Sequence, residues 1–130
     1  MSVSADQTIR AQFESFPAQS IETAFLDTGA GSLTISGISG LGEIEVSAEY
    51  RVGFGVLSDT QRVLDNLRLN MEVQGNTFHL RTEELNGWSL GNSGWIDIAV
   101  KMPKEIALEV KDGSGSLRYS QIAGRVSVPE

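Results

Sequence analysis

The sequence predicts a mainly β protein that forms a single domain over residues 1–130, with a β-solenoid as the expected architecture. A two-sheet β-sandwich is the alternative, because it is built from similar pieces. Three observations support this class. Apolar and polar residues alternate with a period of two along most of the chain. Glycine is abundant, with 14 residues against 3 prolines, which favours many tight turns over disorder. A glycine-rich turn also occurs twice.

The first half of the chain contains the clearest alternation. It begins before Pro17, which is expected to end the first strand, and resumes in a second stretch that ends near residue 25. The residues assigned to the buried face of these strands are Ile9, Ala11, Phe13, Ile21, Thr23 and Phe25. A longer strand over 43–56 then has an apolar face made of Ile44, Val46, Ala48, Tyr50, Val52, Phe54 and Val56. Its other face is polar and is expected to be solvated.

A helix and a hairpin are expected as an insert over about 58–82. Ser58 and Gln61 have the spacing of a capping box, so a short helix is predicted over about 59–67. The hairpin turns at Gly75-Asn76, since both residues tolerate positive φ. Its apolar face is expected to contain Leu67, Leu69, Met71, Val73, Phe78, Leu80 and Thr82.

The last third of the chain is predicted to contain two more strands, joined at Pro103. The residues on their apolar faces are Ile96, Ile98, Val100, Met102, Ile106, Leu108 and Val110.

The duplicated turn lies in two similar segments, 26–46 and 110–128. The structural glycines of the first segment are Gly29 and Gly31, and they match Gly113 and Gly115 of the second. Glycine reaches backbone angles that other residues avoid, so each G-x-G is expected to form a corner between two short strands. Neither turn precedes a helix or a Lys-Ser or Lys-Thr pair, which argues against a phosphate-binding loop. Strand, corner and strand in repetition are typical of a solenoid rung.

The region 95–128, with its earlier copy at 25–50, resembles a bacterial putative-adhesin family of unknown function. The resemblance lies in an alternating strand, a corner containing proline, a further strand and the G-x-G turn. It implies a β-helix-like fold with β-solenoid repeats and a cell-envelope or secreted setting. Together with the duplicated turn, it favours a structural or interaction module. The single histidine and the absence of cysteine argue separately against Ser-His and Cys-His catalysis.

The composition argues against several classes of function. The formal net charge is −7 and the basic residues are scattered, so a nucleic-acid partner is not expected. The chain contains no cysteine, which excludes disulfides and thiolate chemistry. No apolar stretch approaches the roughly 18 residues of a membrane span, and the first residues lack the pattern of a signal peptide. A cytoplasmic location therefore remains open beside the envelope setting. No cofactor is expected.

Few residues are candidates for a site. Trp88 and Trp95 flank a polar, glycine-rich loop, where they could contact a glycan or a protein, although covering the end of the core is the commoner role of such residues. Asp27 and Asp112 precede the two turns and are weak calcium candidates, because hard cations need several converging oxygens. The single histidine, His79, is expected to be a surface residue.

The sequence therefore favours a non-catalytic structural or binding module of a bacterial cell-envelope or secreted adhesin-like protein. Two alternatives from other classes remain. One is a glycan-processing enzyme whose acid and base come from the surface carboxylates Glu43, Glu45, Glu49, Glu83 and Glu84. The other is a domain that self-assembles into a homo-oligomer through its edge strands.

Overall fold

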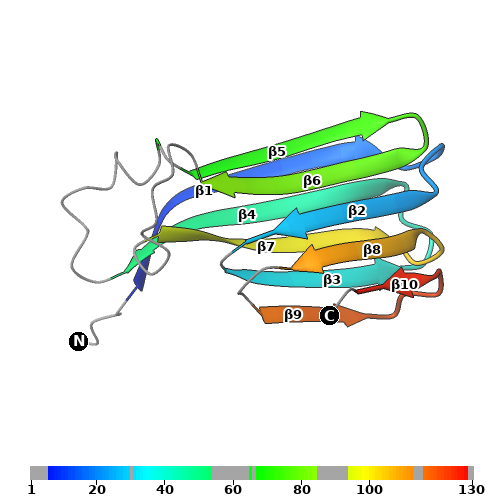
Figure 1. The fold of residues 1–130 in the computed structure, drawn as a ribbon. Helices are drawn as coiled ribbons and strands as arrows, with labels where there is room; N and C mark the ends of the chain where they lie inside the picture. Colours follow the sequence, from blue (N-terminus) through cyan, green and yellow to red (C-terminus); the bar gives the residue numbers. More distant parts are fainter. Residues whose placement is uncertain are drawn as a thin grey trace.

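A computed structural model describes residues 6–29, 31–53, 65, 67–84, 94–112 and 116–128. In this part of the chain two five-stranded sheets face each other (Figure 1). Sheet A has the strand order β1-β4-β7-β3-β9, and sheet B has the order β10-β8-β2-β6-β5. The strands are β1 (Asp6–Pro17), β2 (Thr23–Thr28), β3 (Ser32–Ile38), β4 (Glu43–Gly53), β5 (Leu67–Gln74), β6 (Thr77–Glu84), β7 (Gly94–Pro103), β8 (Ala107–Asp112), β9 (Ser116–Ser120) and β10 (Val126–Ser127).

The architecture is the two-sheet sandwich, and the solenoid prediction is wrong. In a solenoid each coil stacks on the one made just before it. Here β2 of sheet B lies between β6 and β8, and β3 of sheet A lies between β7 and β9, all in parallel pairs. Both neighbours of β2, and both neighbours of β3, therefore come later in the sequence. The pairs β1–β4, β4–β7 and β5–β6 are antiparallel, as the mixed directions in Figure 1 show.

The first parts of the segments 26–46 and 110–128 lie beside each other, as β2 with β8 in sheet B and as β3 with β9 in sheet A. In sheet B, Leu26 is the register partner of Val110. In sheet A, Ser32 pairs with Ser116 and Leu33 pairs with Leu117. These are the same correspondences that align the two sequences. The matching residues of the two segments therefore lie on strands that pair directly. This explains why the repeated order of strand, corner and strand resembles a solenoid although the fold is a sandwich.

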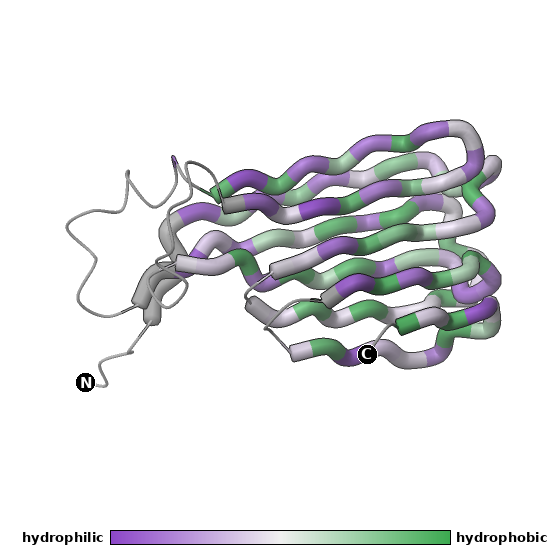
Figure 2. The backbone as a smooth tube through the Cα atoms, in the orientation of Figure 1, coloured by the Kyte–Doolittle hydropathy of each residue, from purple (hydrophilic) through white to green (hydrophobic). Residues whose placement is uncertain are grey.

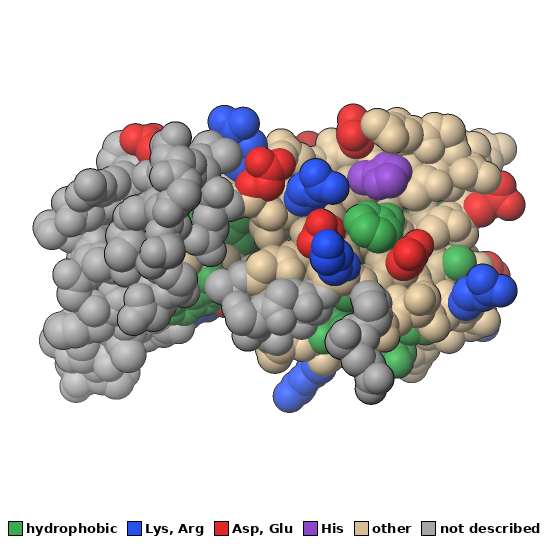
Figure 3. All heavy atoms as spheres, viewed as in Figure 1, with side chains coloured by type: hydrophobic (Ala, Val, Ile, Leu, Met, Phe, Trp, Pro, Cys, Tyr) green, Lys and Arg blue, Asp and Glu red, His purple; other side chains and the backbone are tan. Residues whose placement is uncertain are grey.

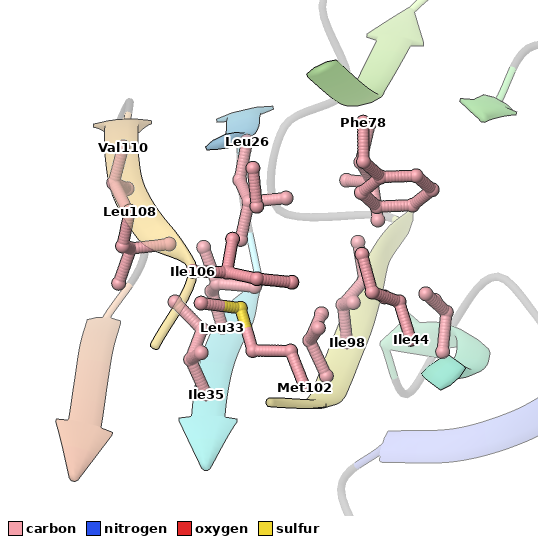
Figure 4. Packing of buried hydrophobic residues seen from close by; sticks show 14 of the residues in the cluster. Leu26, Leu33, Ile35, Ile44, Phe78, Ile98, Met102, Ile106, Leu108 and Val110 are labelled. Atoms are coloured by element: carbon pink, nitrogen blue, oxygen red, sulfur yellow. The ribbon is translucent and has the colours of Figure 1, made fainter. Parts of the chain in front are cut away.

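The core fills the space between the sheets (Figure 4). The alternation of apolar and polar residues along the strands (Figure 2) predicts most of it. The predicted faces of β4, β7 and β8 are buried, as are Phe78 and Leu80 of the hairpin. Figure 4 shows side chains of sheet B, such as Leu26 and Leu108, meeting Leu33 and Met102 of sheet A. The largest side chains that are fully buried are Phe78, Leu26, Leu33, Ile35, Ile44, Leu80, Met102, Leu108, Val46 and Val100.

Two strands present the opposite face from the one predicted. In β1 the exposed fraction of Phe13 is 60%. Phe16 points inward instead, and its ring centroid lies 5.0 Å from that of Phe78. In β2 the buried residues are Ala24 and Leu26, so Phe25 lies on the outer face of sheet B. A small alanine and one leucine give a weaker hydrophobic signal than phenylalanine, which explains the wrong assignment of the β2 face.

Part of the predicted insert falls outside the described residues. The helix over about 59–67 lies there apart from Asp65 and Leu67, and Leu67 is the first residue of β5. Phe54 and Val56 also lie outside the described part, as do the side chains of Ile9 and Val52. The hairpin itself is confirmed, because β5 and β6 pair antiparallel around Gly75, whose φ is +62°.

Candidate binding surface

The outer face of sheet B is hollowed into a groove over β5 and β6, next to β2. The groove has a volume of about 540 Å³, and we call it the Phe25–His79 groove. It is lined by Phe25, Asn70, Met71, Glu72, Gln74, His79, Leu80, Arg81 and Glu83. Figure 3 views this face, with the single histidine in purple beside hydrophobic, acidic and basic side chains. Sequence reasoning missed the groove because it assigned Phe25 to the core.

Strand register brings the aromatic centre of the groove together. Phe25 of β2 and His79 of β6 are direct partners in a parallel pair, so their side chains leave the same face of the sheet. Their ring centroids lie 5.9 Å apart with an interplanar angle of 52°. Both side chains are half-buried. His79 is thus a surface residue, as expected, and one that is held against an aromatic ring.

The polar side chains around the rings are held by their neighbours. The Arg81 guanidinium Nε lies 3.6 Å from Asp27 Oδ2. The Asn70 amide donates a hydrogen bond of 2.7 Å to Glu83 Oε1, and the Gln74 amide donates one of 2.9 Å to Glu72 Oε1. The first contact joins β6 to β2, the second joins β5 to β6 and the third lies along β5, and each limits the rotamers of its side chains. The groove therefore presents amide and carboxylate groups in a defined arrangement.

Of the two calcium candidates, Asp27 and Asp112, the structure describes the side chain of Asp27. Asp27 lies between Arg81 and Lys111 in the strand register, and its carboxylate is in ion-pair distance of Arg81. The side chain of Asp112 lies outside the described residues. Within the described ranges no group of three or more His, Cys, Asp or Glu side chains is arranged to hold a metal ion. The calcium assignment stays a prediction.

Of the two tryptophans, the structure describes only Trp95. It is half-buried near the start of β7 and lines a hollow of about 250 Å³ together with Gly29, Leu67 and Thr82. Trp88 lies outside the described residues, so the expectation that the two rings flank one binding loop stays a prediction.

The first G-x-G corner is anchored to both sheets. The Gly29 N–H donates to Thr82 Oγ1 of β6 at 2.9 Å, and the Ser32 N–H donates to Asp97 Oδ1 of β7 at 2.8 Å. Gly31 between them has a φ of +110°. Gly113 and Gly115 of the second turn lie outside the described residues. Sequence reasoning singled out Gly29 and Gly31 but missed Thr82 and Asp97, which belong to distant strands.

The carboxylates of the enzyme hypothesis are divided between the two sheets. Glu43, Glu45 and Glu49 belong to β4 and lie on the outer face of sheet A, whereas Glu83 lines the groove on sheet B. The side chain of Glu84 lies outside the described residues. Glu49 lies 3.9 Å from Arg51, a contact between carboxylate and guanidinium on the same strand. The described residues therefore do not form a cleft that joins the two sets.

Tyr50 is the titratable group with a resolved shift in the described part of the chain. Burial raises its pKa above the usual value of 10.0, and the nearby Arg10 guanidinium opposes that rise. The Arg10 Cζ atom lies 5.5 Å from the centroid of the Tyr50 ring, and the Tyr50 hydroxyl donates to Gln12 Oε1 at 3.0 Å. This cluster closes the β1 side of the sandwich and offers no acid or base suited to catalysis near neutral pH.

The opposite side of the sandwich ends on β9 and β10 and leaves apolar side chains accessible. Leu117 and Tyr119 of β9 lie on the inner face of sheet A beside Leu33 and Ile35. The exposed fraction of Tyr119 is 48%, and that of Val128 is 37%. A hollow of about 390 Å³ lies along this edge, between β3 and β9.

No family model and no curated protein matches the sequence. No described helix has the length and apolarity needed to cross a membrane. Solved structures do resemble the fold. A putative cell adhesion protein from Clostridium sporogenes is similar with a TM-score of 0.59 and 18% identity over 92% of this chain and 56% of its own. A putative adhesin from Bacteroides fragilis has a TM-score of 0.48 and 10% identity over 87% of this chain and 44% of its own.

A putative lipid binding protein from Parabacteroides distasonis has a TM-score of 0.45 and 16% identity, and the likeness covers 86% of this chain and 42% of that protein. The chain thus spans about half the length of these structures. At 18% identity and a TM-score of 0.59, the likeness to the Clostridium sporogenes protein concerns the fold.

Proposed function

We propose that the chain is a non-catalytic binding module of a bacterial cell-envelope or secreted adhesin-like protein, and that the Phe25–His79 groove is its contact surface. The observation that carries this proposal is the groove itself, because its rings and polar groups are fixed on paired strands and not on loops. Sites on paired strands keep their backbone geometry, so less ordering is needed on binding than for sites on loops. The fold shared with the Clostridium sporogenes protein supports the class of function.

The proposal is tested by adhesion of chain-coated beads to intact bacterial and epithelial cells. Beads carry many copies, so weak contacts add up to measurable adhesion. We expect beads with the parent chain to adhere and beads with Phe25→Ala to lose most of that adhesion. Phe13→Ala is the matched control, since it removes an exposed ring from the outer face of the other sheet. Adhesion that is absent, or equal for all three chains, would overturn the proposal.

The setting of the protein is tested separately. An immunoblot of the native protein after separation of cytosol, envelope and medium should place the band in the envelope or the medium. A band confined to the cytosol would contradict the envelope setting.

The exposed edge at β9 favours a second candidate function, association with another copy of the chain. A second copy offers the same row of Leu117 and Tyr119, so a two-fold pairing of the β9 strands would cover both rows at once. Pairing of similar segments is already present inside the molecule, where β9 lies in register beside β3. This candidate concerns a different surface from the groove, so both functions are compatible in one chain.

For this second candidate we expect sedimentation velocity to show a dimer that grows with protein concentration. Tyr119→Lys should weaken the dimer by about tenfold or more, because it places a charge in the apolar centre of the contact. Val73→Lys is the control, since Val73 is 42% exposed on β5, an edge strand of sheet B, whereas β9 is an edge strand of sheet A. A parent chain that stays monomeric at every concentration would rule this candidate out.

A further inference from the structure

From the chemistry of the Phe25–His79 groove we infer that its ligand is a neutral oligosaccharide. This inference rests on the proposed function and narrows it to one class of ligand. A sugar ring has an apolar face of C–H groups and a rim of hydroxyls that both donate and accept hydrogen bonds. The groove offers the complement of both, and three features of its residues lead to this choice.

The first feature is the aromatic centre with polar groups on its flank. Phe25 and His79 supply ring surface in the groove, and ring faces attract C–H groups as well as other rings. Asn70 and Glu83 lie beside each other as a donor and acceptor pair, and Gln74 and Glu72 form a second pair. Amides and carboxylates together match neighbouring hydroxyls, each of which needs both a donor and an acceptor.

The second feature is the charge of the groove, which favours a neutral ligand. Glu72 and Glu83 line the groove, and the whole chain carries a formal net charge of −7. The guanidinium of Arg81, the cationic side chain among the lining residues, is already within 3.6 Å of Asp27. An anionic ligand would lie close to the carboxylates of Glu72 and Glu83, and repulsion between like charges opposes binding. The Arg81 guanidinium, which could offset this repulsion, already has Asp27 as an ion-pair partner.

The third feature is the pairing of the strands beneath the groove, which favours a saccharide over an extended peptide. Peptides that add to sheets bind through main-chain hydrogen bonds at a free edge. The floor of this groove is the face of the β5–β6 hairpin, whose strands pair from Leu67–Glu84 to Gln74–Thr77, while the outer side of β5 is an edge of sheet B. Strand backbones pair within the plane of the sheet, so a ligand lying on this face meets side chains. The volume of about 540 Å³ falls within the range of about 300–1,000 Å³ common for small-ligand sites.

The inference is tested with chain-coated beads on an array of neutral hexose, N-acetylhexosamine and fucose oligosaccharides, with sialylated and sulfated glycans beside them. We expect binding to at least one neutral class and weaker or no binding to the anionic glycans. Soluble oligosaccharide of the bound class should then shift the NMR amide signals of β5 and β6. Phe25→Ala and Asn70→Ala should each weaken binding by about tenfold or more. Phe13→Ala should leave it unchanged.

Asn70 is exposed, so Asn70→Ala keeps the test valid even if Phe25→Ala unfolds. Binding to no neutral glycan, or equal binding by Asn70→Ala, would overturn the inference. The cell-adhesion assay tests the proposed function separately from the glycan array. Adhesion that requires Phe25 but survives periodate oxidation of the cell-surface glycans would show that the groove binds a partner other than a saccharide. Loss of adhesion after periodate agrees with the saccharide assignment.

Discussion

Replacing Gly31 by alanine should destabilise the protein by about 2–6 kcal/mol, the largest effect we expect from adding a single methyl group. The backbone of Gly31 has a φ of +110°, which residues with a side chain rarely adopt. A Cβ at this position would also overlap the carbonyl oxygen of Ile96 and lie 2.8 Å from its carbonyl carbon. The strand β7 would have to move, since a backbone carbonyl cannot rotate away as a flexible side chain can.

Two other glycines separate the effect of backbone angle from that of contact. Gly40 has a φ of +77° with no atom within 4 Å of an added Cβ, so Gly40→Ala should cost only about 1–2 kcal/mol. Gly42 has open space and no positive φ, so Gly42→Ala should stay within about 0.5 kcal/mol of the parent. Urea unfolding of the three variants measures the series. A Gly31→Ala variant no less stable than Gly40→Ala would show that the close approach to β7 is absent.

The second large effect is expected for Phe78→Ala, which should lower the free energy of unfolding by about 3–5 kcal/mol. The exposed fraction of Phe78 is 0%, and it is the largest fully buried side chain among the residues that the structure describes. The ring of Phe16 packs on it at 5.0 Å, so its loss also removes the contact that ties the end of β1 to sheet B. A typical domain is stable by only about 5–15 kcal/mol, so a substantial part of the stability depends on this ring.

The control for Phe78→Ala is Phe13→Ala, which removes the same atoms from a side chain that is 60% exposed. Phe13→Ala should change the free energy of unfolding by no more than about 0.5 kcal/mol. Thermal and urea unfolding, followed by circular dichroism, should rank the two variants clearly. Similar losses for both would mean that the faces of β1 and β6 are assigned wrongly.

Sequence periodicity predicts strands well where every second residue is large and apolar. This is why the buried faces of β4, β7 and β8 are predicted correctly from residues such as Val46, Ile98 and Leu108. The same reasoning fails in β2, where Ala24 is buried and Phe25 is outside. Periodicity also does not predict the order of the strands in a sheet. The duplicated segment predicts that its two copies have similar structures, but not which strands lie between or beside them.

The candidate site was missed for a related reason. Groove residues such as Asn70 and Arg81 are ordinary polar positions in sequence, and only the register of β2, β6 and β5 places them around one ring. One signal was present, however. An aromatic residue at the polar phase of an alternating strand, as Phe25 is once Ala24 and Leu26 define the buried phase, marks a ring displayed on the surface.

The order of strands in sheet B has a consequence for how the chain acquires its structure during synthesis. The strand β2 obtains one neighbour from β6 and the other from β8, both of which are made much later. A nascent chain that has reached only β4 therefore has the β1–β4 pair but no partner for the β2 edge. Parallel pairing between distant segments is slow and leaves partly made chains prone to aggregation. Sheet B is therefore complete around β2 only after β8 has been made.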